Sequence, residues 1–422
     1  MPFVFFETFG CQMNVADSDL LAASLASRGY EKTDASGVAD LIVINTCSVR
    51  EHAETRALSH ISQHAAHKRH GKTGQSLWVI GCMAERMGES LKQKIPGIDR
   101  IIGARNFETF LLELDEHLEA SGALGMSHAS IPDVSRFVPI MRGCDNYCAY
   151  CVVPQVRGPE KSIEAAAIEN TVRSYVDKGV SEVTLLGQNV NSYRDETTDF
   201  AALLLRLHDI SGLRRIRFTT SHPKDCSEPL VRTIAELPKV CRHVHLPVQS
   251  GSTRILSRMN RKYTRDDYLR LIEMIRKHMP DADITTDAMV GFPSEREEDF
   301  QDTLSLFRQV RFTTAFMFIY SKRGSTAAAA MNDDVTALDK KGRLRELIDC
   351  QTAITKEIYG EMIGTTMSVL FTMRQDGGDG LWMGQDNGCK RVLVACEKSL
   401  AGMILPIRAE KSSGMTIVGK RE

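Results

Sequence analysis

The sequence predicts a multidomain α/β protein built of three parts. Three observations carry this prediction: short apolar runs alternate with helical stretches near the N-terminus, six strand-then-helix units follow, and the C-terminal stretch holds only short strands. We therefore expect an N-terminal open parallel α/β sheet, a central partial (β/α)6 barrel and a C-terminal small antiparallel β-barrel. At 422 residues the chain is too long for one ordinary core, which favours two to three domains.

Three apolar runs in the first part predict buried strands. They are Phe3–Phe6, Leu41–Ile44 and Leu77–Ile80, and continuous apolar runs of this length are typical of parallel strands that are covered on both faces. The stretches Ser48–Arg69 and Glu85–Lys94 between and after them are expected to be helical. This alternation predicts the N-terminal parallel sheet.

Six further strands, separated by helices, are expected in the central part. The strands are Phe137–Met141, Glu182–Leu186, Arg215–Phe218, His243–Leu246, Ile284–Val290 and Ala315–Tyr320. The helices are Ile163–Lys178, Phe200–Ile210, Arg265–His278, Glu297–Val310 and the long Leu338–Met362. Such a row of β/α units favours a barrel-like parallel sheet, with its ligand site at the carboxyl ends of the strands.

The last part has a different pattern. Five short strands are expected there: Met367–Met373, Leu381–Met383, Arg391–Cys396, Met403–Ile407 and Met415–Val418. Five strands in about 60 residues are typical of a small barrel of the oligonucleotide-binding type. The local charge is nearly balanced, so the sequence of this part does not by itself indicate RNA binding.

Composition sets the expected domain boundaries. From Glu119 to Ser135 the chain is small and polar, as linkers are. We therefore expect a first domain over residues 1–120, a linker over 121–135, a central domain over 136–362 and a C-terminal domain over 363–422.

The bulk properties exclude several classes of protein. The chain has 53 Lys and Arg against 54 Asp and Glu, so no overall basic field indicates a nucleic-acid partner, and any RNA contact must use local patches. The N-terminus lacks the basic start and the apolar length of a signal peptide, and no apolar run approaches the roughly 20 residues of a membrane span. We expect a cytoplasmic protein without a membrane partner.

One loop in the central part has the spacing of a metal site. Cys144, Cys148 and Cys151 follow the pattern C-x3-C-x2-C. Thiolates are the usual ligands of iron–sulfur clusters, and three of them on a four-iron cluster leave one iron open to a small molecule. A zinc site is the alternative, but zinc sites usually pair two C-x2–4-C units or add histidines at matching spacing, and neither follows here.

Three more cysteines follow the three N-terminal strands. Cys11, Cys47 and Cys82 each come within a few residues of a predicted strand end. Because the carboxyl ends of parallel strands meet at one edge of a sheet, we expect these cysteines to converge. A lone cysteine in such a position is usually a small buried residue, but three in the same topological place favour a second cluster. The other five show no ligand spacing and are expected to be buried thiols: Cys226, Cys241, Cys350, Cys389 and Cys396.

With these parts in view, the whole chain resembles the methylthiotransferase branch of the radical S-adenosylmethionine (SAM) superfamily. The matching motifs are Gly143-Cys-Asp-Asn-Tyr-Cys-Ala-Tyr-Cys-Val-Val-Pro154, Arg157-Gly158, His245-Leu-Pro-Val-Gln-Ser-Gly251 and Val290-Gly-Phe-Pro293. The resemblance implies an N-terminal domain with three cysteines, a TIM-like radical SAM barrel and a C-terminal TRAM domain. Within the branch, Gly-Cys-Asp-Asn followed by Cys-Val-Val-Pro is most similar to the members that modify N6-(dimethylallyl)adenosine in tRNA.

The resemblance also implies the chemistry. Two 4Fe–4S clusters are implied, one on Cys144, Cys148 and Cys151 that cleaves SAM, and an auxiliary one on Cys11, Cys47 and Cys82. One SAM provides a methyl group to a sulfur of the auxiliary cluster. A second is cleaved to a radical that takes hydrogen from the adenine ring at position 37 of tRNA, next to the anticodon, and the methylthio group moves to that carbon. An unactivated aromatic C–H is no acid at neutral pH, so no catalytic side-chain acid or base is expected.

The loops after the barrel strands provide the candidate SAM residues. They are Tyr150, Gly187, Gln188, Ser221, Gln249 and Asp287. The pair Gly187-Gln188 departs from the Gly-Gly-Glu that the superfamily often has, and ordinary loop capping is the alternative for each polar member. A structural hydrogen bond is the expectation for His222 and His245.

Basic residues near the cysteine loop and beyond it are candidates for RNA phosphates. They are Arg142, Arg157, Arg258, Arg261 and Lys262. The apolar Val152 and Val153, next to Cys151, favour a pocket wall for a prenyl group. The expected partners are the anticodon stem-loop of tRNA and an electron donor such as flavodoxin or ferredoxin, acting on a monomer.

Other functions remain open at this point. One is the same chemistry on N6-threonylcarbamoyladenosine in tRNA, and another is the same chemistry on an aspartate of ribosomal protein S12. Those relatives more often carry Asn after the first Gly-Cys. A more distant alternative is a non-enzymatic iron–sulfur electron carrier, against which the open-iron cysteine pattern and the barrel loops argue.

Overall fold

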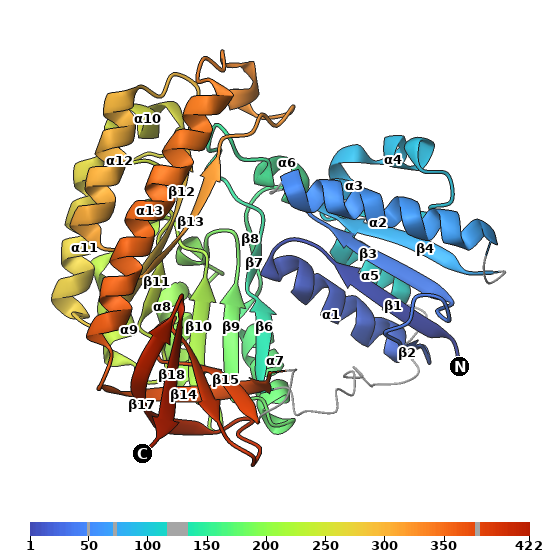
Figure 1. Cartoon of the computed structure of the whole chain (residues 1–422). Helices are drawn as coiled ribbons and strands as arrows, with labels where there is room; N and C mark the ends of the chain where they lie inside the picture. The colour runs from blue at the N-terminus through green and yellow to red at the C-terminus, as the bar shows by residue number, and fades with distance from the viewer. Residues whose placement is uncertain (49–50, 71–73, 116–133, 376–379) are drawn as a thin grey trace. The chain divides into compact units, whose positions relative to one another are not determined.

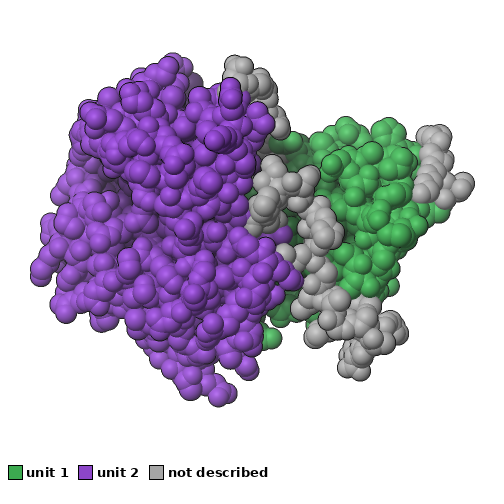
Figure 2. Space-filling view, turned by 90° about the horizontal axis from the view of Figure 1, so that it is seen from below, with its two compact units in different colours: residues 1–130, 142–145, 151–161 green, residues 131–141, 146–150, 162–422 purple. Residues whose placement is uncertain are grey.

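The computed structural model describes residues 1–48, 51–70, 74–115, 134–375 and 380–422. The expected linker over 121–135 lies outside the described residues except for its last two. The chain divides into two compact units, shown in green and purple in Figure 2. Unit 1 comprises residues 1–130, 142–145 and 151–161, and unit 2 comprises 131–141, 146–150 and 162–422. Each is described by itself.

Unit 1 is built on an open parallel sheet with the strand order β2-β1-β3-β4-β5 (Figure 1). Its strands are β1 (Phe3–Thr8), β2 (Glu31–Lys32), β3 (Leu41–Thr46), β4 (Ser76–Gly81) and β5 (Arg100–Gly103). Its helices are α1 (Gln12–Ala26), α2 (Glu51–His70), α3 (Cys82–Met87), α4 (Glu89–Lys94), α5 (Phe107–Asp115) and the short α6 (Val153–Arg157). The predicted N-terminal parallel sheet is confirmed.

Helices cover both faces of this sheet. Ile42 and Ile44 of β3 pack with Ile61 of α2, whereas Leu41 and Val43 of the same strand belong to a second cluster with residues of α1 and α5. Successive side chains of a strand point to opposite faces, so a strand covered on both faces must be apolar at every position. This is why β3 is recognisable in the sequence as an unbroken apolar run.

The sequence did not predict the helices α1 and α5, and the two strands that it missed are short. β2 has only two polar residues, and β5 has two apolar ones. The single helix expected over Glu85–Lys94 is two helices, because Gly88 has a φ of +51° and interrupts the helical backbone.

Unit 2 begins with the partial barrel. Two parallel three-stranded sheets, β6-β9-β10 and β11-β12-β13, are joined through a bridge between Ile216 and Val240. The strands are β6 (Ser135–Pro139), β9 (Glu182–Leu186), β10 (Arg215–Thr219), β11 (His243–His245), β12 (Asp283–Val290) and β13 (Thr314–Ile319). They follow one another in chain order, as in a (β/α)6 barrel, so the predicted fold class is confirmed.

The helices of unit 2 pack on the outside of this sheet (Figure 1). They are α7 (Ala165–Asp177), α8 (Phe200–His208), α9 (Glu228–Glu236), α10 (Thr253–Arg258), α11 (Arg265–His278), α12 (Glu297–Val310) and α13 (Ala337–Glu361). The minor elements of the chain are β7 (Met141–Arg142), β8 (Lys161–Ser162), η1 (Val190–Ser192), η2 (Pro223–Asp225) and η3 (Ala327–Ala330). None of the described helices combines the length and the apolar character that crossing a membrane requires.

The C-terminal strands close into a barrel with the order β14-β15-β16-β18-β17. They are β14 (Thr366–Arg374), β15 (Leu381–Gln385), β16 (Arg391–Ala395), β17 (Ile404–Ser413) and β18 (Thr416–Arg421). The expected small barrel is confirmed, with one difference: β16 and β18 pair in parallel, and the other pairs are antiparallel. Strand directions cannot alternate all the way around a closed ring of five, so one parallel pair is unavoidable.

The C-terminal barrel packs on the amino ends of the central strands. Arg215, the first residue of β10, donates to the carbonyl oxygens of Gln385 and Ser368, at 2.7 Å each. Asp283, the first residue of β12, accepts two 2.6 Å bonds from Lys390. The barrel therefore lies at the end of the sheet opposite to the loops that are expected to bind ligands.

Candidate functional site

The structure brings the three N-terminal cysteines to one edge of the sheet of unit 1. Cys11 is the N-cap residue of α1, Cys47 directly follows β3, and Cys82 begins α3 directly after β4. Thr46 and Gly81 are register partners of the parallel pair β3–β4, so Cys47 and Cys82 follow at the same level. Strand topology thus unites cysteines that are 36 and 35 residues apart in the chain.

Gly10 shows how closely the first two cysteine loops approach. Its φ is +109°, and a Cβ placed there would lie 2.4 Å from Cys47 Cβ and 2.8 Å from Cys47 Sγ. A side chain at this position would therefore displace Cys47 in addition to straining the backbone. Only glycine lets the loop that carries Cys11 pass against Cys47.

A buried polar network holds these loops in place. The side-chain amide of Asn14 donates to the carbonyl oxygens of Phe9 and Thr46, at 2.8 and 2.9 Å, and so ties the loop before Cys11 to the end of β3. Asn45 in turn donates to the carbonyl oxygen of Asn14 at 2.8 Å. Both amides are fully buried, so these bonds are costly to break.

Arg157 lies against the same cysteines. Its Nη2 donates to Asn14 Oδ1 at 2.8 Å and to Asp17 Oδ2 at 3.2 Å, and its side chain is 4% exposed. Burial raises the pKa of the Cys82 thiol to about 11, and negative charge at Cys47 and Cys11 raises it as well, whereas the Arg157 guanidinium lowers it. The three thiols and the guanidinium therefore share one electrostatic environment.

The cysteine loop of the central motif is set by a second obligatory glycine. Gly143 has a φ of +77°, and a Cβ there would lie 1.9 Å from the carbonyl oxygen of Pro159. Directly after it, the amide of Cys144 donates to the carbonyl oxygen of Gly158 at 3.2 Å. Cys144 and Cys151 belong to unit 1 and Cys148 to unit 2, so their proximity follows here from the chain spacing alone.

Cys148 has a buried arginine of its own. Arg261 Nη1 lies 3.3 Å from Cys148 Sγ, and its Nη2 donates to the carbonyl oxygen of Pro247 at 2.7 Å. Tyr150, two residues after Cys148, is half-buried beside an apolar cluster that contains Phe292. This arrangement connects the cysteine loop to the loop after β11.

The candidate SAM residues include polar atoms without a partner. Ser221 Oγ, after β10, and Gln188 Oε1, after β9, are buried and have no hydrogen-bond partner among the described residues. His222 Nε2 is likewise buried and has no hydrogen-bond partner among the described residues. Buried polar atoms are normally paired, so three orphans at the carboxyl ends of adjacent strands are suited to a polar ligand.

The two histidines differ from each other. Burial lowers the pKa of His222 to about 2, with further lowering by Arg261 and Lys224, so this imidazole is neutral. His245 Nδ1 lies 2.9 Å from Thr285 Oγ1, and its Nε2 lies 3.6 Å from Asp287 Oδ1. The expected structural hydrogen bond is therefore present at both histidines, because His222 Nδ1 accepts from the backbone amide of Lys224 at 3.2 Å, while His222 Nε2 has no partner among the described residues.

Gln249 and Asp287 are neighbours across two strands. The backbone amide of Gln249 donates to the backbone carbonyl oxygen of Asp287 at 2.8 Å. Gln249 has a φ of +71°. Gln249 is buried and Asp287 half-buried. Gly187 is buried at the end of β9 and donates to the carbonyl oxygen of Thr219 at 3.1 Å. Gly187 and Gln249 lie after the carboxyl ends of β9 and β11, whereas Asp287 lies within β12.

Of the five arginines and lysines that were expected to meet RNA, Arg157 and Arg261 are buried, and Arg142 is half-buried. Arg142 pairs with Asp17 at 2.7 Å and Glu108 at 2.9 Å, and Arg157 and Arg261 are held as described above. A guanidinium that is enclosed and paired is not available to a phosphate. Arg258 and Lys262 are exposed.

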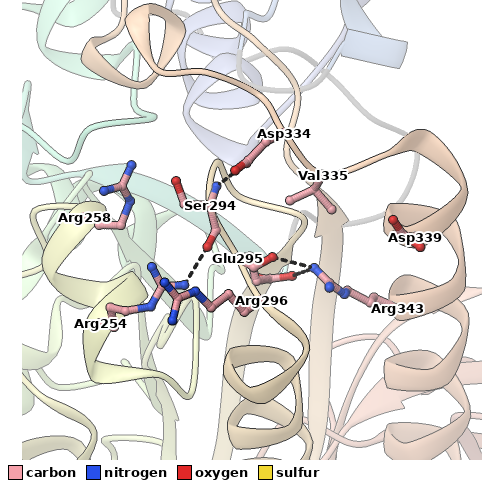
Figure 3. A pocket seen from close by; sticks show the side chains of 9 residues that line it. All are labelled: Arg254, Arg258, Ser294, Glu295, Arg296, Asp334, Val335, Asp339 and Arg343. Atoms are coloured by element: carbon pink, nitrogen blue, oxygen red, sulfur yellow. Dashed lines mark hydrogen bonds and ion pairs between the residues drawn. The ribbon is translucent and has the colours of Figure 1, made fainter.

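Arg258 lines a pocket of about 430 Å³ (Figure 3). Two other arginines of this pocket are already paired, because Arg343 donates to Glu295 Oε1 at 3.0 Å and Arg254 binds Asp299. The figure shows Arg258 pointing away from the Arg343–Glu295 pair. The paired groups make the pocket close to neutral.

The apolar wall expected from the two valines is not present as such. Val152 is buried in a small cluster of unit 1 with Cys82, Ala104 and Val156. Its side chain thus packs in the protein core, since the turn after Cys151 leads directly into α6. Val153 is half-buried.

The donor set decides which metals fit. Among the described residues, no three His, Cys, Asp or Glu side chains are grouped around a point that suits a single metal ion. A 4Fe–4S cluster makes a different demand, because each iron takes a thiolate of its own. All six cysteines of the two sets are free thiols. Sulfur donors fit iron–sulfur clusters and do not fit oxygen-preferring ions such as Mg²⁺.

Sequence reasoning missed the polar residues that position the cysteines. Asn14, Asp17 and Asn45 carry no motif of their own. The available signal was helical spacing, since Asn14 and Asp17 lie three residues apart on the helix that follows Cys11, and an apolar residue is normally expected on its buried face.

Comparisons with known proteins find relatives over nearly the whole chain. Residues 138–307 match the radical SAM superfamily, and residues 3–103 match a family described as uncharacterized protein family UPF0004. The chain is 44% identical over 433 residues to a tRNA-2-methylthio-N(6)-dimethylallyladenosine synthase of Geotalea uraniireducens, covering 99% of this chain and 98% of that one. It is 42% identical to the protein of the same name from Geobacter sulfurreducens, covering 99% and 97%.

Solved structures are similar in fold. A radical S-adenosylmethionine methyltransferase, TsrM, from Kitasatospora setae has a TM-score of 0.57 at 14% identity, covering 89% of this chain and 82% of that chain. The cobalamin-dependent radical enzyme OxsB has a TM-score of 0.52 at 10% identity, covering 82% and 56%. At such identities the likeness extends to the fold alone.

Proposed function

The chain belongs to the tRNA-2-methylthio-N(6)-dimethylallyladenosine synthases, a family of radical SAM enzymes, and we propose that its two cysteine sets each hold one 4Fe–4S cluster. The enzyme adds a methylthio group to N6-(dimethylallyl)adenosine in tRNA, with SAM and 4Fe–4S clusters as cofactors. When bound, these cofactors supply the radical chemistry that side chains cannot.

The auxiliary cluster is assigned to Cys11, Cys47 and Cys82. The observation that carries this assignment is their shared edge of the sheet, where each thiol follows or caps an adjacent element and Gly10 lets two loops touch. A chain that needed only buried thiols would not require this convergence. The cluster that cleaves SAM is assigned to Cys144, Cys148 and Cys151, from their spacing and from the radical SAM match over residues 138–307.

For SAM we propose a site along the carboxyl ends of β9 to β12. The unpartnered Gln188 Oε1 and Ser221 Oγ support it, because a ligand with amine, carboxylate and hydroxyl groups would satisfy such atoms. Gly187 and Gln249 lie after the carboxyl ends of β9 and β11, Asp287 lies within β12 beside Gln249, and the half-buried ring of Tyr150 would stack on the ligand. Neutral His222 would exclude water or hydrogen bond without carrying charge.

For RNA we propose local contacts through exposed Arg258 and Lys262, in keeping with the balanced overall charge. The anticodon loop is single-stranded, so a base can leave the stack and enter the site. We further propose the four-part division at residues 120, 135 and 362, a cytoplasmic monomer, and a flavodoxin- or ferredoxin-type electron donor.

The test compares three substrates in parallel with the anaerobically reconstituted enzyme. They are a prenylated anticodon stem-loop, a threonylcarbamoylated stem-loop and ribosomal protein S12. We expect a methylthio product, detected by mass spectrometry, from the prenylated RNA, and weaker binding of unmodified RNA because its prenyl carbons no longer leave water. Turnover of either other substrate, with none of the prenylated RNA, would contradict the proposed substrate.

A further inference from the structure

Each cysteine set has one buried arginine beside it. We propose that Arg157 and Arg261 are positioning residues for the two clusters: each guanidinium donates to sulfur at one cluster and supplies a positive charge next to it. The inference rests on the proposed ligand sets, and it deepens them by assigning to these arginines a role other than binding RNA.

Arg261 provides the more direct observation, because its charge has no carboxylate partner in the described part of the chain. Its Nε donates to Tyr263 Oη at 2.9 Å and its Nη2 to the carbonyl oxygen of Pro247 at 2.7 Å, both neutral acceptors. The residue is 4% exposed. Buried charges in proteins are normally paired with an opposite charge, so an anion is missing here.

Cys148 is in the position to supply that anion. Its Sγ lies 3.3 Å from Arg261 Nη1, within the range of a hydrogen bond to sulfur. A thiol gives the guanidinium only a weak acceptor, whereas a thiolate gives it a full negative charge. Thiolate is the form that binds iron. The two neutral bonds fix the guanidinium, and Nη1 then lies 3.3 Å from the sulfur and 3.5 Å from the neutral hydroxyl of Tyr150.

Arg157 shows the same design in unit 1. Asn14 and Asp17 hold its Nη2, while its Nη1 is buried without a hydrogen-bond partner among the described residues. Buried donors are normally paired, so a partner is expected. The guanidinium lies beside Cys82, so a cluster sulfur at this edge of the sheet would provide that partner.

The local charge balance supports the assignment. Asp17 serves two guanidinium groups, those of Arg142 and Arg157, and Glu108 contacts both Arg142 and the amine of Lys161. Arg157 thus shares its single carboxylate, and an excess of positive charge remains on the side of Cys82. Arg142 pairs with two carboxylates, Asp17 and Glu108, which makes it a matched control.

The expected consequence is a change in reduction potential. Reduction adds negative charge to a cluster, and the potential depends on net charge and on hydrogen bonds to the sulfurs. A nearby guanidinium stabilises the reduced form, so its removal lowers the potential. Replacement by lysine keeps the charge and loses the fork of donors, so its effect should be smaller.

The experiment uses full-length, anaerobically reconstituted protein in which one cysteine set is replaced by alanine, so that one cluster is measured at a time. Into each parent we introduce Arg157→Met, Arg261→Met, the two lysine variants or Arg142→Met. Iron content, thermal unfolding and the midpoint potential from electron paramagnetic resonance are measured. We expect Arg261→Met to shift the reduction equilibrium of the loop cluster at least tenfold, about 59 mV for one electron, and Arg157→Met to do so for the auxiliary cluster.

Each arginine should affect its own cluster alone, and Arg142→Met should shift either midpoint less than the arginine assigned to that cluster does, because Arg142 acts only through the shared Asp17. Loss of iron in a methionine variant that still unfolds cooperatively also supports the inference, and where a methionine variant does not fold, the lysine variant decides. Unchanged iron and unchanged midpoints for Arg157 and Arg261 variants would overturn it. Absence of iron in a parent is a different result, because it would refute the ligand set itself.

Discussion

The two cysteine sets differ in what brings their three cysteines close together. Cys144, Cys148 and Cys151 are close because eight residues of chain carry all three, so the sequence alone brings them together. Cys11, Cys47 and Cys82 are close because three parallel strands end at one edge, so only the fold brings them together. The comparison teaches that a ligand set made by topology needs support from the surrounding core, which a set made by one loop needs less.

The largest expected difference between the sets is in chemistry. Cys148→Ala should abolish formation of 5′-deoxyadenosine, because the open-iron cluster would lose a ligand. Cys82→Ala should leave SAM cleavage in place and abolish the methylthio product. Both products are measured by mass spectrometry after single-turnover reactions. A Cys82→Ala protein that still forms the methylthio nucleoside would show that the two sets do not have separate roles.

The C-terminal barrel provides a region with no cysteine of either set, against which the two can be compared. Lys390→Ala leaves Asp283 and Asp386 without their buried cation. Removing one partner of a buried ion pair typically costs about 3–5 kcal/mol. We expect urea denaturation to show this loss in unit 2 while iron content at low denaturant is unchanged, and Lys420→Ala, on an exposed pair, to have little effect. Loss of iron in Lys390→Ala would mean that the barrel supports the clusters directly.

The glycines that set the loops should separate the two sets. At Gly10 a methyl group would collide with Cys47, and at Gly143 with the carbonyl oxygen of Pro159. Strain at positive φ and overpacking each cost about 1–3 kcal/mol. We expect Gly10→Ala to lower iron in the auxiliary set only and Gly143→Ala in the loop set only, with Gly29→Ala, which has a positive φ and open space around it, as the control for backbone strain. Equal loss of iron from both cysteine sets in each of the two glycine variants would contradict this separation.

The smallest expected effect is on the polar support of the first set. Asn14→Ala leaves the carbonyl oxygens of Phe9 and Thr46 without their donor, which should cost about 1–3 kcal/mol. Thermal unfolding measures this cost. Because the same amide fixes both cysteine loops, the auxiliary cluster should also release iron to a chelator faster, whereas the loop cluster should not. Equal rates of iron release in the variant and the parent would show that Asn14 does not stabilise the auxiliary cluster.

Much of the fold was predictable, because apolar patterns follow directly from burial. The residues of β9, α11 and α12 have the bounds expected from the sequence. β5 was missed because its two apolar residues make too short a run. The parallel pair β16–β18 follows from closing five strands into a ring, which no local pattern reveals.

The site residues were predictable where a ligand set has a characteristic sequence spacing or topology. They were not predictable where a residue's role depends on tertiary contacts. The three N-terminal cysteines could be grouped from topology alone. Arg157 and Arg261, however, were expected at phosphates, since a lone arginine near a motif gives no sign of whether it is buried. Val152 was expected to line a substrate pocket and lies in the core beside Cys82. Partners of this kind become apparent only when the chain is folded.

Iron counting tests the central claim most directly. Anaerobically reconstituted protein should bind about eight irons, which is two clusters of four. Replacing Cys11, Cys47 and Cys82 together with alanine should reduce this to about four while SAM cleavage persists, and replacing Cys144, Cys148 and Cys151 should leave about four with no SAM cleavage. Unchanged iron in the first triple variant would contradict the account, because the strand-end cysteines would then hold no cluster.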